Sequence, residues 1–178
     1  MNFPVRFIKL AIISVILIFL LFTAISLFIP SHIRISKATD ISNTKEAVMD
    51  YISNPVKWKE WYPGADSLPL FFVDGKTKGI ILDSITKAAL TITEKNDSSV
   101  IATNTGPGVK RQLVTGWKII PGQNENMVTV QWYMDFKFRW YPWEKFSSLF
   151  YENIYGTEME KGLANLKRVA ESGRSSLN

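Results

Sequence analysis

The chain has 178 residues, enough for one ordinary domain and a short additional segment. It contains no Cys and a single His, which leaves no thiol nucleophile, no Ser-His pair within a domain and none of the usual zinc sites. The formal charge of +5 falls to +3 for residues 34–178 (19 Lys and Arg against 16 Asp and Glu), and these charges are interspersed, so the sequence predicts no nucleic-acid partner.

The amino-terminal segment, residues 1–32, predicts a single-pass membrane anchor. No formal charge lies between Lys9 and Arg34, and Leu10 to Ile29 is apolar apart from three small polar residues. About 20 helical residues, at roughly 1.5 Å each, span the roughly 30 Å hydrocarbon core of a bilayer. Pro30 then ends the helix.

A cleaved signal peptide is the alternative interpretation of this segment. Its apolar region would usually have only about 7 to 15 residues and end in a small-residue cleavage site. The nearest match, Ala24-Ile25-Ser26, lies inside the apolar run, so the length favours an uncleaved anchor. Positive charges on the two flanks nearly balance, and the short basic start favours a domain on the outer, periplasmic side.

Residues 33–172 predict an α+β domain, followed by a disordered tail over 173–178. Residues 33–42 alternate in polarity and predict a strand. A helix follows, with Asn43 and Glu46 at the spacing of a capping box. The segment "KWKEW" (57–61) comes next and places two Trp three residues apart among charges.

Several strands are then predicted, separated by turn signals. Asp74-Gly75 is typical of a hairpin, and two strands flank the polar turn at residues 95–98. A further strand ends at Pro121-Gly122. The next, "MVTVQWYMDFKF", has an apolar face and a polar face, as expected for an antiparallel sheet that covers a core; the apolar face consists of Val128, Val130, Trp132, Met134, Phe136 and Phe138.

The last part of the domain, residues 143–171, predicts helix with an interruption at Gly156-Thr157. Two apolar sets recur at helical spacing: Trp143, Phe146, Leu149, Phe150 and Ile154, and then Met159, Leu163, Leu166 and Ala170. The segment "FRWYPWEKF" (138–146) is consistent with packing between the last strand and this helix and also with an aromatic belt at a membrane interface.

The order of these elements resembles the START/polyketide-cyclase-like (SRPBCC) superfamily, and in particular its membrane-anchored bacterial members. The resemblance covers most of residues 30–171 and rests mainly on the Trp58-x-x-Trp61 pair and on "EKGLANLKRVAE" near the end. It implies a helix-grip fold, in which a curved antiparallel sheet wraps around a long carboxyl-terminal helix and encloses an apolar cavity. Residues 65–88 depart from the usual pattern of the superfamily, which leaves strand boundaries and cavity shape open there.

The predicted function is therefore a membrane-tethered binding domain for a hydrophobic small molecule or lipid. The candidate ligand-binding residues are mostly apolar, as such pockets require: Trp58, Trp61, Trp117, Trp132, Met134, Phe136, Phe138, Phe150 and Ile154. We assign no catalytic residue, no metal and no cofactor. Two alternatives stay open: an enzyme that uses Asp50, Glu60 or Tyr62 on an apolar substrate, and an envelope interaction module whose cavity is filled by its own side chains.

Overall fold

The computed structural model describes residues 5–107, 109, 112–122, 124 and 126–175. The chain divides into two compact units. The first unit comprises Met1–Ile33 and Phe138–Phe150, and the second comprises Arg34–Lys137 and Tyr151–Asn178. Residues 138–150, which the sequence predicted to lie within the α+β domain, group with residues 1–33 in the first unit.

The first unit contains two helices. Helix α1 (Val5–Ser26) is long and apolar enough to cross a bilayer by its length and composition. Helix α4 (Pro142–Ser148) has Pro at its first position, where the missing N–H costs no helical hydrogen bond. The backbone N–H of Phe138 donates to the carbonyl of Ser31 at 2.8 Å, which joins the two chain segments of this unit.

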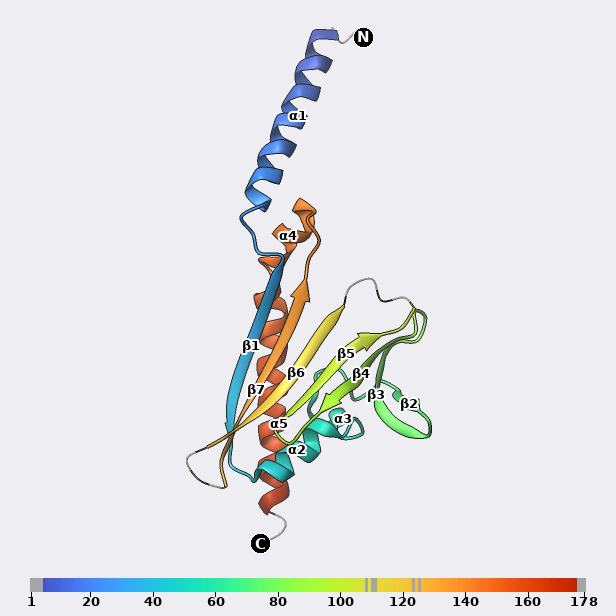
Figure 1. Cartoon of the computed structure of the whole chain (residues 1–178), viewed down its shortest axis with the longest axis vertical. Helices are drawn as coiled ribbons and strands as arrows, with labels where there is room; N and C mark the ends of the chain where they lie inside the picture. Colours follow the sequence, from blue (N-terminus) through green and yellow to red (C-terminus); the bar gives the residue numbers. More distant parts are fainter. Residues whose placement is uncertain (1–4, 108, 110–111, 123, 125, 176–178) are drawn as a thin grey trace. The chain divides into compact units, whose positions relative to one another are not determined.

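The second unit is built on a seven-stranded sheet with the order β1-β7-β6-β5-β4-β3-β2 (Figure 1). Neighbouring strands from β2 to β7 are antiparallel. The strands are β1 (His32–Ile41), β2 (Leu70–Val73), β3 (Lys76–Asp83), β4 (Ala88–Lys95), β5 (Ser99–Thr105), β6 (Leu113–Pro121) and β7 (Val128–Lys137). Register shifts in β2, β3 and β4 mark β-bulges, which bend a sheet and increase its twist.

Helices of the second unit cover one face of this sheet. They are α2 (Lys45–Ser53), α3 (Trp58–Trp61), the π-helical turn η1 (Glu152–Gly156) and α5 (Thr157–Ser175). Figure 1 shows α5 running along the long strands β1, β7 and β6. Met159, Leu163, Leu166 and Ala170 of α5 are at most 2% exposed. This arrangement of a curved antiparallel sheet and a long final helix is the helix-grip fold that the sequence predicted.

Local signals in the sequence explain most element boundaries. Asp74 and Gly75 both have positive φ (51° and 73°), as the two central residues of a type I′ hairpin turn require. Strand β7 alternates buried and half-buried residues along its length, which confirms its predicted apolar face. The interruption predicted at Gly156-Thr157 is the junction between η1 and α5.

Three expectations need correction. The cap of α2 is Thr44, whose hydroxyl accepts a hydrogen bond from the Ala47 N–H, because Asn43 is instead used to bind Ala170 of α5. The first apolar set of the final segment is not a buried face, since Trp143, Leu149, Phe150 and Ile154 are 56–63% exposed. Helix α5 also extends to Ser175, into the predicted tail, whose residues 176–178 lie outside the described part of the chain.

Candidate functional site

The Trp-x-x-Trp pair lies on the short helix α3, as predicted. Trp58 and Trp61 are 0% and 1% exposed, whereas Lys59 and Glu60 are exposed. The Nε1 atom of Trp58 donates to the carbonyl of Ile52 at 2.7 Å, and Nε1 of Trp61 donates to the carbonyl of Tyr51 at 3.1 Å. These two bonds attach α3 to the end of α2, where helix carbonyls otherwise lack partners.

Both Trp side chains belong to an aromatic cluster inside the second unit. We define this cluster as Trp58, Trp61, Tyr62, Trp117 and Trp132. Neighbouring ring centroids are 5.3–6.2 Å apart, mostly in tilted or edge-to-face arrangements, which is the favourable range for aromatic pairs. The cluster therefore fills the space between β6, β7 and α3 with the cluster's own rings.

The polar atoms of the aromatic cluster differ in their hydrogen bonding to the described residues. Nε1 of Trp132 donates to Oγ1 of Thr115 at 2.7 Å. Nε1 of Trp117, by contrast, is buried without a partner in the described residues. The Tyr62 hydroxyl also has no hydrogen-bond partner among these residues, but unlike Trp117 Nε1 it is not sealed from solvent.

Burial raises the pKa of Tyr62 well above its usual value, and the phenol of Tyr155 raises this pKa further. Tyr62 is thus a neutral phenol at ordinary pH, able to donate a hydrogen bond and unsuited to act as a base. Its side chain is nevertheless half-buried by accessible surface, so it is enclosed by protein but not fully sealed off.

A second aromatic group lies further along β7. Phe136 contacts Tyr151 and Tyr155, with ring centroids 5.0 and 4.7 Å apart. Exposure rises along the inner face of β7 towards this group, from 0% at Val130 to 5% at Met134 and 8% at Phe136. The inner face of β7 is therefore buried along its whole length and slightly more accessible near Phe136 than beside the four Trp of the aromatic cluster.

The helix beside this more accessible region is distorted. Residues Glu152–Gly156 form a π-helical turn, a feature found often at functional sites. The ammonium group of Lys37 on β1 contacts carboxylates on either side of the junction, Glu152 at 2.8 Å and Glu160 at 2.9 Å. These ion pairs link the wide helical turn to the edge strand β1.

The predicted ligand-binding residues are partly brought together. Trp58, Trp61, Trp117 and Trp132 form most of the aromatic cluster, and Met134 and Phe136 continue its side of β7. Ile154 of η1 is 56% exposed. Phe138 and Phe150 belong to the first unit, where Phe138 is buried and Phe150 is 63% exposed, so their part in a pocket stays a prediction. Tyr151 and Tyr155 were not among the predicted residues, and no spacing in the sequence distinguishes them.

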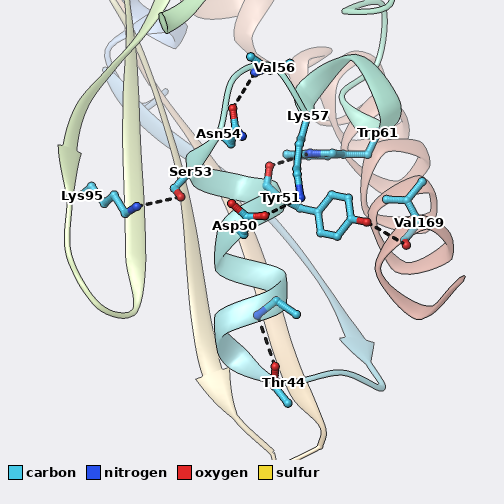
Figure 2. A network of polar contacts seen from close by, with 11 residues as sticks. Thr44, Asp50, Tyr51, Ser53, Asn54, Val56, Lys57, Trp61, Lys95 and Val169 are labelled. Atoms are coloured by element: carbon cyan, nitrogen blue, oxygen red, sulfur yellow. Dashed lines mark hydrogen bonds and ion pairs between the residues drawn. The ribbon is translucent and has the colours of Figure 1, made fainter. Parts of the chain in front are cut away.

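A network of polar contacts surrounds α2, as Figure 2 shows. Lys57 binds the carboxylate of Asp50 and lies over the ring of Tyr51, 4.5 Å from its centroid. The hydrogen bond from Lys57 to Asp50 raises the pKa of Lys57. The Tyr51 hydroxyl donates to the carbonyl of Val169 at 3.4 Å, which links α2 to α5.

Hollows near α2 are lined by a mixture of polar and apolar groups that does not include the predicted apolar residues. One of them is bordered by Lys45, Glu46, Met49, Asp50, Ser53, Lys95, Asn96 and Asp97. None of the nine predicted ligand-binding residues lines it or the two neighbouring hollows. Among the residues that the structure describes, no group of His, Cys, Asp and Glu is arranged to hold a metal ion.

The fold and its interior define a START-like (SRPBCC) helix-grip domain. Residues 32–171 match the family described as polyketide cyclase / dehydrase and lipid transport, and the chain belongs to this family. No curated protein matches the sequence.

Solved structures with this fold come from several bacteria. A Staphylococcus aureus protein of unknown function has a TM-score of 0.61 at 14% identity, covering 81% of this chain and 96% of its own. A START superfamily protein from Mycobacterium smegmatis has a TM-score of 0.55 at 13% identity, covering 78% and 97%. The XoxI protein of Bacillus cereus has a TM-score of 0.55 at 14% identity, covering 79% and 95%. At these identities the similarity shows the fold alone.

Proposed function

We propose that this protein is a membrane-tethered binding domain for a hydrophobic small molecule or lipid. Membership of a family described by lipid transport supports the class of ligand. The length and apolar composition of α1 support the tether. The ligand would lie between the sheet and the final helix, as the superfamily resemblance implies.

The accessible end of the interior is where we place the ligand. Met134 and Phe136 supply an apolar wall there, and Tyr155 packs against Phe136. The cluster residues Trp117 and Trp132 would form the closed end of this site. The other predicted residues would contact the ligand at its edges or pack behind the residues that line the site.

The Tyr62 phenol is the single observation that carries this proposal. It is enclosed enough for desolvation to raise its pKa, keeps accessible surface, and has no hydrogen-bond partner in the described residues. The hydroxyl is a neutral donor that protein groups leave available, and a ligand carrying an acceptor oxygen would take the place of water on it. The proposed ligand is therefore apolar with at least one carbonyl, ester or ether oxygen.

Native mass spectrometry of the full chain, extracted in a mild detergent and incubated with a lipid extract, tests the proposal. We expect an additional mass that is released on denaturation and extracts as an apolar compound. Tyr62→Phe should weaken retention of this compound about fivefold, the effect of one hydrogen bond of about 1 kcal/mol. Lys59→Ala, on the exposed side of α3, is the matched control and should retain it fully.

The packing of the aromatic cluster favours a second candidate function. Trp58, Trp61, Trp117 and Trp132 are at most 1% exposed and occupy the interior themselves. A domain filled in this way would serve as an envelope interaction module. A chain that stays free of any added mass after incubation with lipid extract would support this second function and contradict ligand binding.

A further inference from the structure

Helix α4 in the first unit has its charged residues inside, while most of the large apolar residues at the helix and just after it are outside. Glu144 and Lys145 are 8% and 6% exposed, whereas Trp143, Leu149 and Phe150, at the helix and just after it, are 60–63% exposed. A helix on the surface of a protein in water shows the reverse arrangement, with apolar residues towards the core. The outward side of this segment is thus suited to an apolar environment.

The buried charged groups of α4 are used to satisfy backbone atoms. Nζ of Lys145 donates to the carbonyl of Ile29 at 2.8 Å, and Oε2 of Glu144 accepts the N–H of Arg139 at 2.9 Å. Ile29 follows the end of α1, where carbonyls lose their helical partners. Lipid offers such groups no hydrogen bond, so partners from within the protein are needed at a membrane boundary.

Contacts with α1 set the position of α4 along the apolar helix. Phe146 packs edge-to-face on Phe22, with ring centroids 5.5 Å apart. Phe22 precedes the last residue of α1, Ser26, by four positions, or about 6 Å along the helix axis at 1.5 Å per residue. Segments that lie in a membrane interface insert to a similar depth, about 5–10 Å.

The side of α1 that is covered near this contact differs from the rest of the helix. Ser26 is fully buried and Thr23 is half-buried, while the surrounding apolar residues of α1 are exposed. Two of the three polar interruptions in the apolar run therefore occur where the helix is covered by protein.

Aromatic residues with polar atoms precede α4. Tyr141 stacks on Trp143 with an interplanar angle of 8°, and its ring centroid is also 4.9 Å from that of Trp140. Trp140 is 66% exposed. Trp and Tyr are enriched at membrane interfaces, where an apolar ring and a polar atom both find suitable surroundings.

We propose that residues 138–150 form a second membrane contact, which lies in the boundary between headgroups and acyl chains beside the end of α1. The boundary residues, those that would contact lipid, are Leu27, Phe28, Trp140, Trp143, Leu149 and Phe150, which are 60–90% exposed. The occupant of this surface is a phospholipid bilayer, because the surface is continuous with the apolar helix that would span it. The inference rests on the tether in the proposed function and is independent of ligand binding.

The distribution of Trp residues makes the contact measurable. The chain has six Trp, of which the four in the aromatic cluster are at most 1% exposed. Trp140 and Trp143 are thus the two within reach of a quencher. The experiment uses the full chain in vesicles of phosphatidylcholine and phosphatidylglycerol, with or without brominated acyl chains. We expect brominated lipid to reduce Trp emission and iodide in the water phase to have little effect.

Substitutions identify the source of this quenching. The double variant W140F/W143F keeps the apolar surface and should lose the lipid-dependent quenching. W117F removes a buried Trp instead and should retain it. Flotation of the vesicles on a density gradient verifies that each chain is inserted.

Three results would overturn the inference, and only the first also contradicts the tether. A chain that does not float with the vesicles would contradict both the tether and the second contact. A chain that floats, but whose emission is quenched by iodide and not by brominated lipid, would contradict the second contact alone. Absence of both kinds of quenching, together with cross-linked dimers, would assign the surface to a second copy of the chain and also overturn the inference.

Discussion

Gly162 of α5 lies directly against the indole of Trp132 on β7. A Cβ atom at this position would come within 2.5 Å of Cζ3 of Trp132 and 2.9 Å of Cδ of Pro63. Neither neighbour is the end of a flexible side chain, because Trp132 is held within the aromatic cluster and proline is a closed ring. The close approach of the final helix to the sheet therefore depends on the absence of a side chain here.

Gly162→Ala should destabilise the second unit by about 1–3 kcal/mol, the usual cost of overpacking a core. Urea denaturation of the full chain in a mild detergent measures this change. Gly156→Ala is the matched control, because its Cβ would meet only Cε of Lys37 at 3.1 Å and carboxylate atoms of Glu152 at 3.2 Å and beyond. Equal stability of G162A and wild type would mean that α5 can move away from Trp132 at little cost.

Trp117 and Trp132 provide a second matched pair, because both are at most 1% exposed but only one makes an indole hydrogen bond. W132F removes the donor to Oγ1 of Thr115, whereas W117F removes a donor that has no partner in the described residues. We expect W132F to be less stable than W117F by about 1 kcal/mol, the net value of one hydrogen bond. The free energies of unfolding of the two variants decide this, and the reverse order would show that the Trp117 N–H is stabilised by a neighbouring ring.

The raised pKa of Tyr62 leads us to expect a loss of stability at alkaline pH. Its pKa in the folded protein is raised above the unfolded value of about 10, so its contribution to stability is complete below about pH 10. Above that pH the unfolded chain releases the phenol proton while the folded chain retains it, and the free energy of unfolding falls. Tyr62→Phe should reduce this fall between about pH 9 and about pH 11, as measured by denaturant unfolding at each pH.

Lys57 titrates in the same pH range and must be separated from Tyr62. Its pKa is also raised, so the stability that it contributes is present below about pH 10.4 and is lost as the pH rises through its folded-state pKa. Because this ion pair lies at the surface, its effect should be small. Comparison of Y62F with the double variant D50N/Y62F separates the two contributions to the fall in the free energy of unfolding. If this fall is the same in Y62F as in the wild type, the role given to Tyr62 is wrong.

The hydrogen bonds of Asn43 are expected to stabilise the junction between β1 and α2. Its side-chain amide donates to the carbonyl of Ala170 at 2.7 Å and accepts the N–H of Thr44 at 2.7 Å, and the residue is 8% exposed. Asn43→Ala leaves both backbone groups without this partner and should cost about 1–3 kcal/mol. Asn54→Ala, which loses only an exposed hydrogen bond to the Val56 N–H, should cost much less. Thermal unfolding followed by circular dichroism compares the stability of N43A and N54A. Similar losses of stability in both variants would show that the buried bonds of Asn43 contribute no more than the exposed bond of Asn54.

Patterns with a strict period were predictable from the sequence. The inner face of β7 follows from the two-residue period of strands, and the turn at Asp74-Gly75 follows from the need for positive φ. The Trp pair on α3 was predicted to face the interior and does so. In each case the signal lies within a few neighbouring residues.

Features that depend on distant partners were not predictable. Helical spacing of Trp143, Leu149 and Phe150 indicates an apolar side but not what covers it, and these residues are exposed. Asn43 matches a capping position, yet its amide binds a residue 127 positions away. Whether the Tyr62 hydroxyl and Trp117 Nε1 find a partner among the described residues likewise depends on which acceptors approach them in three dimensions.

The order of the sheet has a consequence for biosynthesis. Strand β1 is the first to be made, but its neighbour β7 is the last, and the bidentate pair of Arg34 with Asp135 joins residues 101 positions apart. At about 5–20 residues per second, a ribosome needs roughly 5–20 seconds to supply that partner. During this interval α1 and β1 are already made, while β1 has no strand to pair with. Docking of β7 onto β1 is therefore a late step in folding, and the nascent chain carries an unpaired strand directly after the apolar helix α1 until then.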